Sequence, residues 1–137
     1  MSTEKVGTHD IPGTQRMTAH IPSVAAATAT IVYPIFSAPF KCTVTKVICV
    51  AQDNVAGDDT DRKNLNVLDT GAAGAGTTEI GNKDLITGVN MADMDETEID
   101  VTDTELSDGD VLALQIEKAG NGVLLPAMLV IVEYEGT

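Results

Sequence analysis

Two stretches near the end of the chain decide the fold: DVLALQIEK at residues 110–118 and AMLVIVEYE at residues 127–135. In the first stretch, the large apolar residues Leu112, Leu114 and Ile116 recur at every second position. This period of two is typical of a half-buried β-strand, because successive side chains point to opposite faces of a sheet. The second stretch has the same period, so both are predicted to be strands. Gly120 and Gly122 lie between them and readily adopt positive φ angles, which predicts a turn and a C-terminal hairpin.

The clearest strand elsewhere covers residues 40–51. Its predicted apolar face consists of Phe40, Cys42, Val44, Ile48 and Val50. Lys46 interrupts this face, which predicts a β-bulge or a sheet edge. Cys42 and Cys49 are seven residues apart in the same strand, so we expect them on opposite faces, too distant for a disulfide. Both are predicted to be buried and reduced.

Shorter candidate strands cover residues 27–36, 65–69, 77–80, 85–90 and 98–102. No stretch shows a sustained helical period. Eight strands in 137 residues predict an all-β, jelly-roll-like antiparallel β-sandwich of about eight strands with an extended N-terminal arm. The arm covers residues 1–23, which mix polar residues, Gly and Pro without a period, and the sandwich domain covers residues 24–137.

The composition excludes several classes of partner. The chain has 21 Asp and Glu against 8 Lys and Arg, a net charge of −13. Binding to nucleic acid or to an anionic membrane depends on an excess of Lys and Arg, so neither partner is expected. A membrane span needs roughly 20 consecutive apolar residues, and the sequence has no such run. Apolar residues make up 43% of the chain, enough for a folded core.

The sequence motifs point away from catalysis. The glycine-rich residues 71–76 lack the Lys-Ser/Thr of a phosphate loop and are predicted to form a hairpin tip. The acidic residues at 53–61 and 93–110 do not follow the spacing of a calcium loop, so they are interpreted as a solvated rim, with a turn at Asp108-Gly109. Both histidines, His9 and His20, lie in the expected arm. We therefore expect no enzyme, no catalytic residues, no metal and no cofactor.

Two segments resemble a known family. The stretch LSDGDVLALQIEKAGNGVLLPAMLVIVEY at residues 106–134 resembles the C-terminal hairpin of small structural proteins on the heads of tailed bacteriophages. The stretch FSAPFKCTVTKV at residues 36–47 resembles an early strand pair of the same proteins. Together they cover about a third of the chain, and they are strand and turn patterns rather than a site.

The resemblance implies a capsid decoration (cement) protein. Such a protein is a β-rich module, often a homotrimer, that binds major capsid protein on the outer surface of the virion after synthesis in the host cytoplasm. It stabilises the shell by bridging subunits, because a ligand that binds only the assembled state favours that state. The arm is then expected to contact the capsid. Its expected apolar anchors are Ile11, Met17, Ile21 and Val24.

Two alternatives remain open at this point. The first is a head-fibre or receptor-binding jelly-roll module that attaches to glycans. It requires exposed aromatic residues or a cation, and the available aromatic residues are Tyr33, Phe36, Phe40 and Tyr134. The second is an enzyme on a trimeric β fold, such as a nucleotide hydrolase, and its Asp, Tyr and Arg motif is not found in the sequence.

Overall fold

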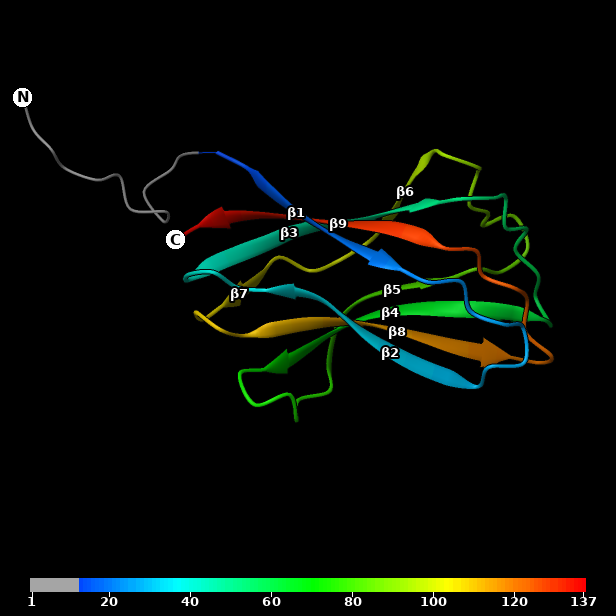
Figure 1. Ribbon diagram of the computed structural model, residues 1–137, viewed down its shortest axis with the longest axis horizontal. Helices are drawn as coiled ribbons and strands as arrows, with labels where there is room; N and C mark the ends of the chain where they lie inside the picture. The colour runs from blue at the N-terminus through cyan, green and yellow to red at the C-terminus, as the bar shows by residue number, and fades with distance from the viewer. Residues whose placement is uncertain (1–12) are drawn as a thin grey trace, which may run out of the picture.

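The computed structural model describes residues 13–137, which form two antiparallel sheets packed face to face (Figure 1). Sheet I contains, in spatial order, β1 (Gln15–Ile21), β9 (Met128–Gly136) and β3 (Cys42–Ala51). β6 (Glu96–Ile99) and β7 (Thr104–Leu106) lie end to end along the far edge of β3. Sheet II contains β2 (Thr30–Ser37), β8 (Val111–Ala119), β4 (Arg62–Gly71) and β5 (Thr78–Asp84). None of the described residues is helical, and hence none forms a helix able to cross a membrane.

The strand pairs are nested in the sequence. β1 pairs with β9, β2 with β8, β3 with β6 and β7, and β4 with β5. The first half of the chain therefore pairs with the second half in reverse order, and most connections cross from one sheet to the other. The predicted fold class is confirmed as an all-β, antiparallel β-sandwich, with nine strands in two sheets over the described residues.

The predicted C-terminal hairpin is wrong. β8 lies in sheet II and β9 in sheet I, so the two strands that decide the fold class do not pair. The turn itself is present, with φ angles of 61° at Gly120 and 73° at Gly122, but the chain then crosses between the sheets. Alternation shows which residues face a core, and it is the same whether two strands pair or face each other across the core. The early segment at residues 36–47 likewise joins strands of different sheets.

A β-bulge in β3 changes which residues face the core. The register between β3 and β9 shifts between Val44 and Lys46, close to the predicted irregularity. The extra residue moves the buried face from Cys42 and Val44 to Val47, Cys49 and Ala51. Both cysteines therefore face the core, contrary to the expectation that they lie on opposite faces. They are buried and unpaired, as predicted.

Two other strand predictions need correction. Residues 85–90 form a loop: the Val89 N–H donates to the Ile86 carbonyl at 2.9 Å, and Gly88 has a φ of 88°. Leu85 is nevertheless fully buried, which explains why the segment looked like a strand. The predicted strand at residues 98–102 is mostly wrong: only residues 98 and 99 belong to a strand, β6, and residues 100–103 link β6 to β7. The glycine-rich residues 71–76 join the paired strands β4 and β5, as expected.

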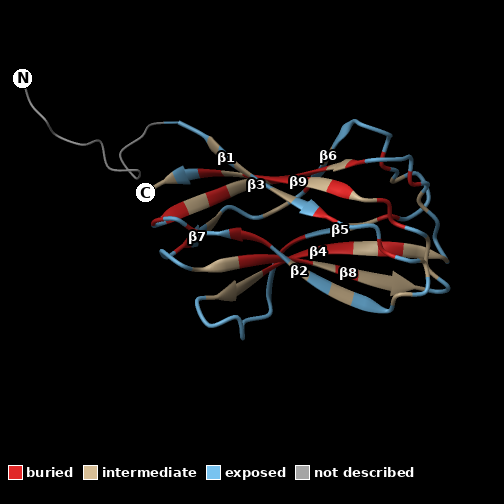
Figure 2. Cartoon of the chain, in the orientation of Figure 1, coloured by how far each residue is buried: buried red, intermediate tan, exposed pale blue. Residues whose placement is uncertain are grey.

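The core lies between the two sheets and consists mainly of Val, Leu and Ile. Figure 2 shows the buried residues along β3, β4, β8 and β9. Three of the aromatic residues, Phe36, Phe40 and Tyr134, belong to this core. The ring of Tyr134 lies 5.0 Å from the ring of Phe36 and 6.0 Å from that of Phe40, measured between centroids.

Candidate interaction surface

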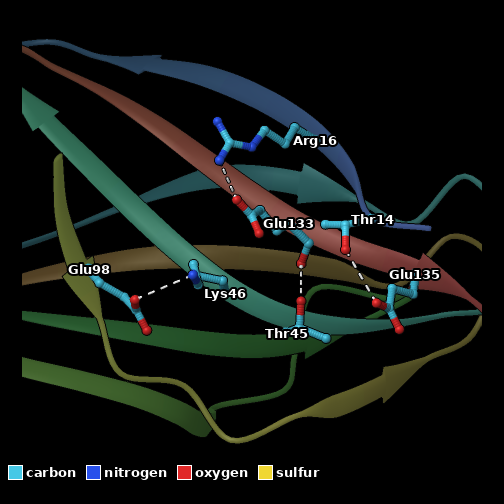
Figure 3. Close-up of polar contacts among 7 residues, drawn as sticks. All are labelled: Thr14, Arg16, Thr45, Lys46, Glu98, Glu133 and Glu135. Atoms are coloured by element: carbon cyan, nitrogen blue, oxygen red, sulfur yellow. Dashed lines mark hydrogen bonds and ion pairs between the residues drawn. The ribbon is translucent and has the colours of Figure 1, made fainter.

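The edge strand β1 is the first part of the candidate surface. It pairs with β9 without a break from Gln15 to Ile21. Within residues 13–137, no strand pairs with its other side, so one row of its main-chain groups is left without a strand partner. Two side-chain contacts attach it to β9 (Figure 3): Arg16 Nη2 lies 2.6 Å from Glu133 Oε2, and Thr14 Oγ1 donates to Glu135 Oε1 at 3.3 Å.

The other sheet edges carry features that hinder strand addition. β2 contains Pro34 and a register shift directly after it. The edge of β5 is covered by the link between β6 and β7, where the Thr102 N–H donates to the Ile80 carbonyl at 2.8 Å. β6 and β7 have only four and three residues and carry Glu96, Glu98 and Glu105. β1 has neither Pro nor a bulge, which makes it the sheet edge most open to a further strand.

The expected arm anchors have a different role in the described chain. Ile21 and Val24 are each 3% exposed and belong to the core, while Met17 is half-buried against it. These residues hold β1 on the sandwich, so they are not free to contact another protein. Ile11 and His9 lie outside the described residues. For residues 15–21, the expectation of a flexible arm is therefore wrong, because every second side chain of β1 packs inward.

An apolar strip runs along the outer face of sheet I. Ile48 and Ile131 are cross-strand neighbours on this face, only 4% and 6% exposed. The ion pairs between Arg16 and Glu133 and between Lys46 and Glu98 lie on the same face (Figure 3). The strip continues through the next pair of cross-strand neighbours, Val50 and Leu129.

The strip ends in an open groove of about 680 Å³. Pro22, Val50, Met94 and Leu129 line it, together with His20 and Gln52. Met94 is 70% exposed and has a φ of 58°, the only positive φ of a non-glycine residue among the described residues. The groove therefore presents an exposed, adaptable apolar side chain at the end of the edge strand.

Sheet II carries buried polar groups that the sequence did not single out. Asn66 Nδ2 donates to Gln115 Oε1 at 3.0 Å and to Glu117 Oε1, and Asn66 Oδ1 accepts from Asn82 Nδ2 at 2.6 Å. Leu65 and Val67 point into the core, so Asn66 points outward. The alternation of polar and apolar residues along β4 is the sequence feature from which this network could have been predicted.

Lys63 is fully buried at the end of the sandwich. Its Nζ donates to the carbonyl oxygens of Ala25, at 3.0 Å, and Thr28, at 2.8 Å. Burial lowers the pKa of Lys63, and the neighbouring Lys118 lowers it further. Lys63 thus fixes the loop between β1 and β2, and its role is structural.

The acidic loop at residues 53–61 is organised by hydrogen bonds to its carboxylates. Asp58 Oδ1 accepts from the backbone N–H groups of Asp61 and Thr60, and these two bonds lower the pKa of Asp58. Asp59 Oδ1 accepts from the Thr87 N–H at 3.0 Å, and Asp61 Oδ1 from the Asn121 N–H at 2.8 Å. Over residues 13–137, no three His, Cys, Asp or Glu side chains are grouped to hold a metal.

Comparison with known proteins adds no relative. No family model matches the chain, and no curated protein matches it. The candidate surface, formed by the free edge of β1 and the groove beside it, therefore has to be interpreted from its own geometry.

Proposed function

We propose that the protein is a virion structural protein that binds the exterior of an icosahedral phage capsid and stabilises the shell by bridging major capsid subunits. The observation that carries the proposal is the free edge of β1, which is continuous over seven residues and has neither Pro nor a bulge. An extended segment of another protein can add to such an edge through main-chain hydrogen bonds. The choice of a capsid subunit as the partner rests on the resemblance of residues 36–47 and 106–134 to strand and turn patterns of phage head proteins, and residues 106–134 do not form the hairpin of that resemblance.

The proposed mechanism is strand addition at this edge. Addition of a capsid strand to β1 fixes the sandwich to one subunit, and a homotrimer presents three such edges to neighbouring subunits. Bridging contacts exist only in the assembled shell, so binding favours assembly over dissociation. The charge of −13 favours the outer surface, away from packaged nucleic acid. Synthesis in the host cytoplasm fits the two buried, unpaired cysteines.

The glycan-binding alternative receives less support. Phe36, Phe40 and Tyr134 are buried between the sheets, and Tyr33 is half-buried against the same core. Sugar rings stack on exposed aromatic faces, and these rings do not offer one.

Density-gradient sedimentation of a native lysate tests the proposal. We expect the protein to travel with icosahedral particles and to protect them from dissociation on heating. A protein that remains at the top of the gradient as a small oligomer contradicts the proposal.

A pair of variants at one exposed position of β1 tests the edge itself. Thr18→Lys places a charge on the edge strand. Lys residues on the edge strands of natural proteins hinder the addition of a further strand. Thr18→Val keeps the shape of the side chain. We expect Thr18→Lys to lose co-sedimentation and Thr18→Val to keep it. Equal co-sedimentation of both variants would exclude the edge of β1 as the contact.

A further inference from the structure

The groove at the end of β1 has an apolar floor and a negatively charged surround. Val50 and Leu129 extend the apolar strip of sheet I into it, and Pro22 lines it from the residue after β1. Side chains of this kind gain free energy when a partner removes them from water.

Met94 is held at the groove in a conformation that few residues adopt. Its N–H donates to the Ala51 carbonyl at 2.9 Å, and this hydrogen bond is made with a φ of 58°. A positive φ costs free energy for any residue with a side chain. Of the large apolar side chains exposed elsewhere, Val32, Ile86 and Leu124, none lines the groove.

Four carboxylates adjoin the residues that line the groove. Asp93 and Asp95 flank Met94, Asp53 follows Gln52, and Glu96 is the cross-strand partner of Val50. Within residues 13–137, no Lys or Arg forms an ion pair with any of the four. No Lys or Arg is among the residues that line the groove. An occupant with the opposite charge is therefore favoured by the surrounding field.

We infer that this groove docks an apolar side chain carried on a positively charged segment of another protein. A second copy of this chain is a poor occupant of the groove, because it would bring a net charge of −13 to the four carboxylates beside it. The inference names the chemistry of the partner. It rests on the proposed function only in identifying that partner as a capsid subunit.

A titration of the full chain with a defined peptide tests the inference. The chain carries ¹³C-labelled Met, Leu and Val methyl groups, and the probe is the end-blocked peptide Lys-Lys-Leu-Leu-Lys-Lys, followed by NMR. We expect saturable shifts at Met94, Leu129 and Val50. Replacing both Leu of the probe by Ser, or all Lys by Glu, is expected to abolish them. Equal shifts of these methyl groups with the Ser probe would overturn the inference, since charge alone then explains the binding.

Met94→Gly separates docking from folding. Glycine adopts a positive φ without strain, so this variant is expected to unfold at a higher temperature than the wild type. It is also expected to bind the probe about tenfold more weakly, because the exposed apolar side chain is lost. Leu124→Ser, at an exposed apolar residue that does not line the groove, is the matched control and is expected to bind normally. Unchanged affinity of Met94→Gly would overturn the inference.

The same variants distinguish the inference from the proposed function. Loss of probe binding in Met94→Gly supports the groove whether or not the protein sediments with capsids. Failure of the wild type to sediment with capsids contradicts the proposed function and leaves the peptide result as it stands.

Discussion

Arg16 on β1 and Glu133 on β9 form an ion pair across the outer face of sheet I, with 2.6 Å between Nη2 and Oε2. Glu133 is also the register partner of Lys46 on β3. The strand that carries Glu133, β9, therefore lies between the strands that carry Arg16 and Lys46. The Arg16 side chain is 52% exposed and that of Glu133 only 12%. The edge strand is therefore attached to the sheet through β9, and within residues 13–137 no strand pairs with its other side.

Replacing Arg16 by Ala tests how far this pair holds β1. Exposed ion pairs contribute little, so we expect a loss of only about 0.2–1 kcal/mol in the free energy of unfolding. Hydrogen exchange of the β1 amides should accelerate, while the amides of β3 and β8 exchange as before. A global loss well above this range would contradict the assignment of Arg16 to a local contact.

Replacing Ile21 by Ala tests whether β1 belongs to the core. Ile21 is buried between the sheets, and truncation of a buried Ile costs about 2–5 kcal/mol. Thr18→Ala, at an exposed position of the same strand, is the control and should change stability by about 0.5 kcal/mol or less. Chemical denaturation measures both. Equal stabilities would mean that β1 is a mobile arm after all.

Replacing Gly120 by Ala tests the turn that leads from β8 across to sheet I. A Cβ at Gly120 would lie 2.3 Å from the Thr60 carbonyl oxygen and 2.5 Å from Asp61 Oδ1. Gly74 also has a positive φ, but open space surrounds it. Both substitutions strain the backbone by about 1–3 kcal/mol, and only Gly120→Ala adds a steric clash. We expect a clearly lower thermal midpoint for Gly120→Ala than for Gly74→Ala, and identical midpoints would contradict the close approach.

The buried thiol of Cys49 predicts a loss of stability at alkaline pH. Burial raises the pKa of Cys49 from 9.0 to about 12, opposed in part by Lys83. Below pH 9 both folded and unfolded chains keep the proton, and the stabilisation is fully present. Between pH 9 and 12 only the unfolded chain loses it, so stability falls by up to about 1.4 kcal/mol per pH unit.

Cys49→Ala removes this titration. Denaturation curves measured from pH 8 to pH 10.5 should show a shallower decline for Cys49→Ala than for the wild type. The variant is less stable at pH 8, because it loses buried volume. Parallel pH profiles of the two proteins would show that the Cys49 thiol does not titrate differently on unfolding.

The fold class could be predicted from the sequence because apolar and polar residues alternate clearly in the central strands, which have a neighbouring strand on each side. β1 is different: its inward residues Gln15, Met17 and Ala19 are polar, flexible or small, and only Ile21 is a strong apolar signal. The position of Lys46 predicted an irregularity in β3. The sequence did not predict that this bulge would change which of the later residues of the strand face the core. Leu85 shows the converse error, since a buried residue in a loop resembles part of a strand.

The candidate surface depends on topology, which periodicity does not encode. Whether β1 has a free side depends on the order of the strands, set by the packing of the whole chain. The groove combines residues 20–22, 50–52, 94 and 127–129, which lie far apart in the sequence. Met94 and its acidic neighbours looked like part of a solvated rim, because nothing in the sequence places them beside Val50 and Leu129.

The central claim is that the free edge of β1 is the contact with the capsid. Hydrogen–deuterium exchange of the protein, free and bound to purified shells, tests it most directly. The claim predicts that the amides of residues 15–21 exchange more slowly in the bound protein, while the β5 edge of sheet II exchanges at the same rate. Unchanged exchange at residues 15–21 in the bound protein would contradict it.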